Sequence, residues 1–208
     1  MKLTYFAFYG RAEEIRLMHH IKGVDFEDYH VEQKDWPTIK TDKERFPFGQ
    51  MPTLEKDGKV YSQSVAIARL VARENGFYPT DAEEAYYVDV LTESLRDVYT
   101  GIFGLAALKT DEEKKEALEK LETTTLPINF SAWEELIKAN SSQEFWHGET
   151  ETVADIGLVC FYTNQILISQ IKDSLQAALD KYPVLKEYLE KRQEAHKEYF
   201  EQRPSFPL

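Results

Sequence analysis

Residues 3–23 read LTYFAFYGRAEEIRLMHHIKG, and this stretch decides the fold of the N-terminal part of the chain. Its first part, Leu3 to Phe8, is an apolar and aromatic run that predicts a buried strand. From Arg11 to Lys22, apolar residues recur every three or four positions, which predicts a helix with one buried face. Gly23 is a natural end for that helix. A strand followed closely by a helix is typical of the beginning of an α/β domain.

Strands and helices continue to alternate as far as Gly76. Val24 to Val31 predicts a second strand, and Asp35 is the predicted N-cap of a short helix that follows it. Two β-rich runs then flank Asp57-Gly58, a sequence typical of a tight hairpin turn. We expect Ser64 to cap the next helix and Asn75-Gly76 to end it. This β-α-β-α-β-β-α order predicts a small sheet with a parallel crossover and then an antiparallel hairpin.

Beyond Asp81 only helical patterns appear. The clearest of them places Val88, Leu91, Leu95, Val98 and Ile102 at helical spacing. Thr152 followed by Asp155 three residues later predicts a capping box, and the apolar helix after it is expected at the centre of the helical part. We therefore predict two domains, residues 1–77 and 81–208.

Composition excludes several classes of partner. The chain has 208 residues and a formal charge of −12, which argues against binding to nucleic acid or anionic membranes. No apolar run is long enough to span a membrane, and the N-terminus does not read as a signal segment. The single cysteine, Cys160, fits a reducing compartment, so we expect a cytoplasmic protein. The five histidines have no metal-ligand spacing, and no metal is expected.

Five short motifs in the first half of the chain, taken in order, resemble the sigma class of the cytosolic glutathione transferases. These motifs are Leu3-Thr4-Tyr5-Phe6, Gly10-Arg11-Ala12-Glu13, Asp35-Trp36-Pro37, Pro47-Phe48-Gly49-Gln50-Met51-Pro52 and Gln63-Ser64-Val65-Ala66-Ile67. The resemblance implies an α/β thioredoxin-like domain that binds glutathione, followed by an all-α domain that contributes a hydrophobic substrate site. It also implies glutathione as cosubstrate, a hydrophobic electrophile as second substrate, and a homodimer.

The family resemblance assigns the central chemical role to Tyr5. The thiol of glutathione has a pKa near that of cysteine, about 8.5, and the thiolate is the nucleophile. Lowering that pKa by about two units needs about 2.7 kcal/mol, which is within reach of one hydrogen bond to the anion. Tyr5 would donate that bond, and Arg11 would add positive potential beside it. A tyrosine packed in the core and a solvated arginine are the simpler alternatives.

Further residues would hold the rest of the glutathione molecule. Trp36 and Lys40 match the pair that binds the glycine carboxylate, but the segment after Lys40 is longer than in the family, so Lys43 or Arg45 could replace it. Gln50, Met51 and Pro52 belong to a turn that resembles the family's cis-proline turn, whose backbone pairs with the cysteinyl peptide.

The glutamyl end of glutathione is expected at a helix N-terminus. Gln63 and Ser64 would bind its carboxylate, because free N–H groups and the helix dipole favour an anion there. Asp97 matches an acid that reaches the partner subunit's glutathione across a two-fold axis. The alternative is an ordinary exposed aspartate on a helix.

The second substrate would lie against aromatic and apolar side chains. The predicted pocket residues are Phe8, Tyr9, Tyr99, Phe103 and Leu208, with Tyr9 at its rim, although at helical spacing the same residues could be ordinary core. The thiolate would also start the reduction of organic hydroperoxides. Two alternatives remain: a prostaglandin D isomerase, in which a tryptophan would stand where this chain has Gly104, and a non-catalytic crystallin or ligand carrier of the same fold.

Overall fold

The computed structural model describes residues 1–206, and these residues form two compact units. The first unit comprises Met1–Tyr78 together with the chain from Glu198 onward, and the second comprises Pro79–Lys197. The sheet and its helices belong to the first unit, whereas the second is helical throughout. None of the helices within residues 1–206 combines the length and the apolar character that crossing a membrane requires.

The first unit is built on a four-stranded sheet in the order β2-β1-β3-β4. Its strands are β1 (Lys2–Phe6), β2 (Glu27–Val31), β3 (Thr53–Lys56) and β4 (Lys59–Ser62). β1 runs parallel to β2 and antiparallel to β3, with Tyr5 opposite His30. The hairpin between β3 and β4 turns at Asp57 and Gly58, both with positive φ, which confirms the predicted tight turn.

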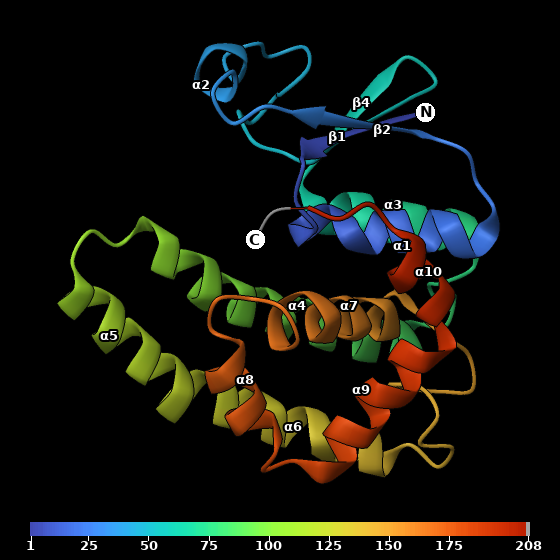
Figure 1. The fold of residues 1–208 in the computed structure, drawn as a ribbon. Helices are drawn as coiled ribbons and strands as arrows, with labels where there is room; N and C mark the ends of the chain where they lie inside the picture. The colour runs from blue at the N-terminus through green and yellow to red at the C-terminus, as the bar shows by residue number, and fades with distance from the viewer. Residues whose placement is uncertain (207–208) are drawn as a thin grey trace. The chain divides into compact units, whose positions relative to one another are not determined.

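Two helices of the first unit, α1 (Glu13–Lys22) and α3 (Ser64–Asn75), lie side by side under the sheet (Figure 1). Both end as predicted, at Gly23 and Gly76, where the left-handed backbone suits glycine. A 3₁₀ turn, Gly10–Ala12, precedes α1, and the short helix α2 (Trp36–Ile39) follows β2. The predicted β-α-β-α-β-β-α order is confirmed.

Two local predictions in this unit need correction, and that of Asp35 is confirmed in its position. Ser64 is the first helical residue of α3, and Gln63 holds the N-cap position with a φ of 72°. Asp35 does occupy the N-cap of α2, but its side chain makes no capping hydrogen bond there. The second strand begins at Glu27 rather than Val24, because only the residues from Glu27 pair with β1.

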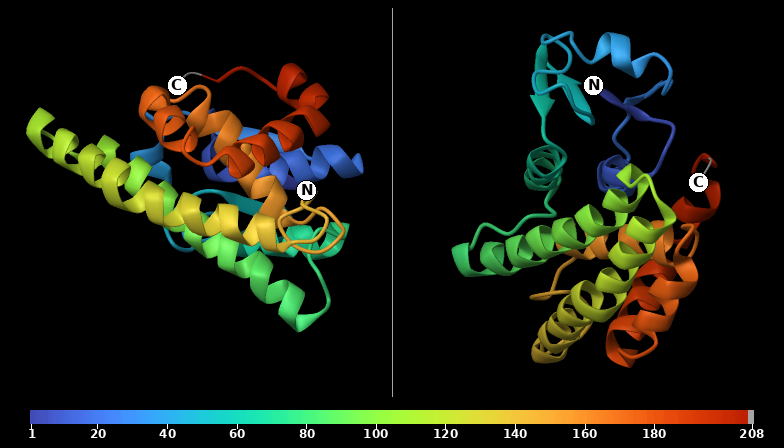
Figure 2. Two further views of the ribbon diagram at one scale, coloured as in Figure 1. Left: turned by 90° about the horizontal axis from the view of Figure 1, so that it is seen from below. Right: turned by 90° about the vertical axis from the view of Figure 1, so that its left-hand side faces the viewer.

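The second unit is a bundle of helices, two views of which are given in Figure 2. Its α-helices are α4 (Ala82–Gly104), α5 (Asp111–Lys120), α6 (Leu126–Ala139), α7 (Val153–Phe161), α8 (Lys172–Leu179) and α9 (Pro183–Ala195). The predicted apolar face of α4 is confirmed, since Val88, Leu91, Leu95, Val98 and Ile102 are all buried. Every residue of α7 is buried, and the helix packs against α4 and α9, which confirms its central place in the bundle.

The capping box at the start of α7 is also confirmed. The Thr152 hydroxyl and backbone N–H both donate to Oδ2 of Asp155, at 2.8 and 2.7 Å. The other carboxylate oxygen accepts from the Trp146 N–H and from the Tyr188 hydroxyl, each at 2.6 Å. Burial raises the pKa of Asp155, and these donors work against that rise. One carboxylate therefore ties the loop before α7 to α9.

The apolar helix expected after Thr152 does not stay α-helical along its whole length. It passes at Tyr162 into a π-helical segment, Tyr162–Ile166, and a second such segment, Leu121–Thr125, joins α5 to α6. The sequence gives no warning of either, because a π turn keeps the same apolar residues buried while adding one residue to the turn.

Candidate active site

Most of the predicted glutathione-binding residues surround one cavity of about 220 Å³ in the first unit. Its lining residues are Phe6, Arg11, Trp36, Gly49, Gln50, Met51, Pro52, Gln63 and Ser64. They come from the end of β1, the 3₁₀ turn before α1, α2, the turn before β3 and the start of α3. Segments that are far apart in the sequence thus meet at the end of the sheet where β1 stops and β3 begins.

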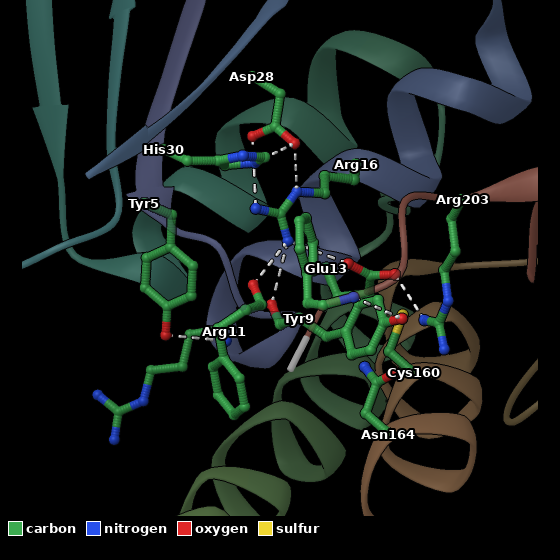
Figure 3. A network of polar contacts seen from close by, with 12 residues as sticks. Tyr5, Tyr9, Arg11, Glu13, Arg16, Asp28, His30, Cys160, Asn164 and Arg203 are labelled. Atoms are coloured by element: carbon green, nitrogen blue, oxygen red, sulfur yellow. Dashed lines mark hydrogen bonds and ion pairs between the residues drawn. The ribbon is translucent and has the colours of Figure 1, made fainter. Parts of the chain in front are cut away.

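Tyr5 is buried on β1, next to the segment that carries Arg11. Its hydroxyl oxygen accepts a hydrogen bond from the backbone N–H of Arg11 at 3.4 Å (Figure 3). Burial raises the pKa of Tyr5, while that N–H and the charges of Arg11 and Arg16 lower it, with a net upward shift. The phenol is therefore protonated near neutral pH, as a hydrogen-bond donor to an anion must be.

Gly10 makes room for the Tyr5 hydroxyl, and its role was missed from the sequence. Its φ is +39°, and a Cβ at this position would lie 2.8 Å from the Tyr5 oxygen and 2.7 Å from the ring of Phe8. No side chain fits there without displacing one of these groups. Two signals were present in the sequence: Gly10 begins one of the five motifs, and it stands between two residues of the proposed site, Tyr9 and Arg11.

Trp36 is wedged between two aromatic rings. Its ring meets Phe6 at 5.8 Å and Phe46 at 5.0 Å, in both cases edge to face. This packing holds the indole at the wall of the cavity. Phe6 also lines the cavity and was another residue that the sequence reasoning did not select.

The turn before β3 contains a cis peptide bond between Met51 and Pro52, as the motif suggested. Met51 and Pro52 line the cavity directly before the first residue of β3. Across the cavity, α3 begins at Ser64. Since a helix leaves the N–H groups of its first turn without intrahelical partners, this end of α3 is suited to a carboxylate.

Gln63 stands just before that helix in an uncommon conformation. Its φ of 72° and ψ of 110° fall where glycine is usually found. Residues held in such backbone conformations cluster at ligand-binding sites, where the surrounding structure imposes them. The conformation therefore marks Gln63 as a member of the site independently of the sequence motif.

Of the two lysines considered for the glycine carboxylate, Lys43 and not Lys40 lies close to the cavity. Lys40 ends α2, is exposed and is not among the cavity-lining residues. The ammonium nitrogen of Lys43 lies 3.8 Å from the point that a Cβ on the lining residue Gly49 would take. The basic group closer to the cavity wall is therefore that of Lys43.

The residues predicted for the second substrate are distributed over both units. In the first unit, Tyr9 is buried rather than exposed at a rim, because the Arg203 guanidinium lies 3.9 Å over its ring. In the second unit, Tyr99 and Phe103 stack on α4 at 5.3 Å, and Asp97 is exposed on the same helix. Phe8 is half-buried, and Leu208 lies outside the described residues.

Arg16 belongs to the stretch that decides the fold, but the sequence assigned it no role in the site. Its guanidinium binds Asp28 through Nε at 2.8 Å, and its Nη1 donates to the backbone carbonyls of Phe8 and Tyr9 at 3.0 and 3.3 Å. Burial acts to lower the pKa of Arg16, but the carboxylates of Glu13 and Asp28 raise it. The carbonyls it holds belong to the loop between Tyr5 and Arg11 (Figure 3).

Comparison with known proteins agrees with this arrangement. The chain matches the family described as glutathione S-transferase, N-terminal domain, over residues 1–73, and the corresponding C-terminal domain over residues 96–203. It is 32% identical to glutathione S-transferase 1 of Ascaris suum, with 99% of this chain and 98% of that protein covered. It is 33% identical to the hematopoietic prostaglandin D synthase of Gallus gallus, covering 88% of this chain and 85% of the relative.

A solved structure of a sigma-class glutathione transferase from Fasciola hepatica is similar over the whole length. It superposes with a TM-score of 0.81 at 28% identity and covers 100% of this chain and 98% of its own. A thioredoxin-like unit followed by a helical unit defines the class of protein. The chain belongs to the glutathione S-transferase family, and it is an enzyme of that family with glutathione as substrate.

Proposed function

We propose that this enzyme is a sigma-class glutathione transferase that ionises glutathione through Tyr5 and conjugates the thiolate to hydrophobic electrophiles. The observation that carries the proposal is the cavity beside β1, in which Arg11, Trp36, Gln63 and Ser64 come together. The assignment to the sigma class is supported by the five motifs and by the likeness to the Fasciola hepatica enzyme.

The chemistry starts with a proton leaving the bound thiol. In the proposal, the Tyr5 hydroxyl donates a hydrogen bond to the sulfur and favours its anion over the thiol. Arg11 adds positive potential, which matters because the chain as a whole carries −12 and glutathione is itself an anion. The thiolate then attacks an electrophilic carbon and displaces its leaving group. With an organic hydroperoxide it attacks an oxygen and breaks the O–O bond, which releases the alcohol and leaves a sulfenic acid that a second glutathione converts to the disulfide and water.

The rest of the site would hold glutathione in register. Its glycine carboxylate would meet the indole N–H of Trp36 and a basic side chain, and the position of Lys43 favours it over Lys40, with Arg45 as the alternative. The backbone at Met51, next to Gln50 and before Pro52, would pair with the cysteinyl peptide. The glutamyl carboxylate would then bind where α3 begins.

The second substrate and the partner subunit complete the proposal. We assign Phe8, Tyr9, Tyr99, Phe103 and Leu208 to the hydrophobic substrate pocket. A homodimer would bring Asp97 of each subunit to the partner's glutathione, as its exposure on α4 permits. The proposal keeps two domains, with boundaries 1–77 and 81–208. It also keeps a cytoplasmic location, because the single cysteine, Cys160, fits a reducing compartment.

A second candidate function is prostaglandin D isomerisation, which the likeness to the Gallus gallus synthase favours. Against it stands Gly104, the position where a tryptophan was expected in such an enzyme. A Cβ on Gly104 would meet none of the described atoms within 4 Å, so a larger side chain has space there. A substrate panel on the purified enzyme separates the two functions: isomerase turnover above conjugation would overturn the assignment.

The decisive test is Tyr5→Phe beside Tyr9→Phe. Loss of one hydrogen bond to the thiolate should lower activity near neutral pH by roughly 10- to 100-fold and raise the apparent pKa of the bound thiol. Thiolate absorbance of bound glutathione measures that pKa directly. Unchanged ionisation in Tyr5→Phe, or a larger effect of Tyr9→Phe, would sink the assignment to Tyr5. An absence of ionised thiol in the unsubstituted protein would instead support a carrier.

A further inference from the structure

The C-terminal segment of the first unit is anchored to the buried carboxylate of Glu13. Residues 203–206, which follow helix α10 (Lys197–Gln202), run back across α1 (Figure 1). The Tyr199 hydroxyl and the Arg203 guanidinium both donate to Oε1 of Glu13, at 3.0 and 2.6 Å. The Glu13 side chain is 1% exposed and that of Arg203 is 8% exposed, so water screens this pair little.

Through Arg16, Glu13 also connects the C-terminal segment to the loop that follows β1. Its second oxygen, Oε2, accepts from Nη1 of Arg16 at 3.1 Å. The same nitrogen also donates to the carbonyls of Phe8 and Tyr9. A continuous chain of hydrogen bonds therefore joins the C-terminal segment to the loop, with Glu13 between two arginines (Figure 3).

The loop that Arg16 holds leads to Gly10 and Arg11, which belong to the proposed thiolate site. Gly10, with its φ of +39°, and Arg11 follow Tyr9 directly, and the Arg11 N–H reaches the Tyr5 oxygen at 3.4 Å. That distance is already at the long end for an N–H···O bond, so a small shift of the loop would break it. The orientation of the Tyr5 hydroxyl depends in this way on where the loop lies.

The C-terminal segment also packs against the loop directly. The Phe206 ring lies 5.1 Å from that of Tyr9 and 5.3 Å from the Arg16 guanidinium. The Phe206 N–H donates to the Tyr9 hydroxyl at 3.4 Å. The Arg203 guanidinium also lies over the Tyr9 ring. Together these contacts bury Tyr9 and fix the loop that contains it.

We propose that Tyr199 and Arg203 are positioning residues for the glutathione chemistry, acting through Glu13 and Arg16 on the loop that orients the Tyr5 hydroxyl. The inference rests on the proposed function of Tyr5 and extends it to the opposite end of the sequence. Neither residue lines the cavity, so neither is expected to touch glutathione. Their effect should appear in the ionisation of the thiol rather than in the binding of the peptide.

The experiment measures two variants over a range of pH. Tyr199→Phe removes one donor to Glu13, and Arg203→Gln removes the charge. In both, kcat/KM at about pH 6.5 should fall roughly 3- to 10-fold and recover at higher pH, because the thiol then ionises without help. The apparent pKa of bound glutathione should rise in parallel, with KM for glutathione nearly unchanged. Arg203→Lys should restore part of the loss, since an ammonium can replace the Nη1 contact with Glu13 but not the stacking of the guanidinium on Tyr9.

Matched controls come from the second unit. Tyr182→Phe also removes a tyrosine hydroxyl bond, to the Pro127 carbonyl at 3.2 Å. Arg192→Gln removes a buried arginine that lies 3.6 Å from Glu151 and over the Phe145 ring. We expect both controls to lose stability similarly and to keep the pH profile of the unsubstituted enzyme.

Two results would separate the possible failures. If Tyr5→Phe shifts the thiol pKa while Tyr199→Phe and Arg203→Gln lower only the melting temperature, the network is a structural anchor and the inference is wrong. If Tyr5→Phe itself changes nothing, the proposed function fails first. Should Arg203→Gln not fold, the milder Tyr199→Phe decides alone, because it removes no charge.

Discussion

The two units of this chain both bury polar side chains, but they use them differently. In the helical unit, Asp155 accepts four hydrogen bonds within a closed set of partners. In the first unit, Tyr5 and Arg16 contact the loop that leads to Arg11, a residue that lines the cavity, and these contacts hold a loop rather than a helix end. A closed polar cluster stabilises the fold, whereas one bordering a cavity is available for chemistry.

The largest expected effect tests the helical side of this comparison. Asp155→Ala should lower the free energy of unfolding by roughly 3–5 kcal/mol, because each buried donor left unpaired costs about 1–3 kcal/mol. Urea unfolding measures the loss. The bound thiol should ionise as before in the protein that remains folded. A changed thiol pKa would break the comparison, since it would give Asp155 a part in the chemistry.

Asp81→Ala is the matched control, since Asp81 caps α4 by accepting from the N–H groups of Glu83 and Glu84 in an exposed position. Because this cap is exposed to water, its loss should cost clearly less stability than the loss of Asp155. Equal losses in the two variants would mean that the burial of Asp155 adds nothing.

Gly10→Ala tests the first unit. A Cβ at this position meets the Tyr5 oxygen and the Phe8 ring, so we expect a stability loss of about 1–3 kcal/mol and a fall in activity of roughly tenfold or more. Gly58→Ala is the control, because its φ of +72° carries the same backbone penalty while none of the described atoms lies within 4 Å. Activity lost equally in both variants would assign the effect to the backbone and not to Tyr5.

The smallest effect concerns His19, a buried residue of the first unit that stays clear of the cavity. Neither of its ring nitrogens has a partner among the described residues, and its ring lies 4.9 Å from that of Phe26. Burial lowers the pKa of His19; Glu74 raises it and Lys56 lowers it, but burial dominates. The folded protein therefore binds this proton less readily than the unfolded chain does.

The stability that depends on neutral His19 is complete above the unfolded-state pKa, about 6.5, and is lost as the pH falls through the folded-state value. His19→Phe should flatten this acid limb in urea unfolding at a series of pH values. His147→Phe, which keeps the stack on Tyr87, should leave it as it is. An unchanged acid limb in His19→Phe would show that other groups account for it.

Local sequence was a sound guide wherever a structure is decided by neighbours in the chain. The hairpin at Asp57-Gly58, the helix ends at Gly23 and Gly76, and the capping box of Thr152 were all predicted and confirmed. Each depends on interactions within about four residues, which a sequence motif records completely. The predicted N-cap of α3, Ser64, was one residue too late. Gln63 takes that position with a positive φ, which a glutamine in the sequence does not predict.

By itself, then, the sequence determined the order of elements, the family and most of the residues that line the cavity of the first unit, since these follow from periodicity and from short motifs. Only the tertiary structure decided what connects them. Glu13 and Arg203 are 190 residues apart, and no local pattern relates a carboxylate in α1 to an arginine near the C-terminus. Their pairing, like the space that Gly10 leaves for Tyr5, exists because folding brings distant segments together and excludes water from between them.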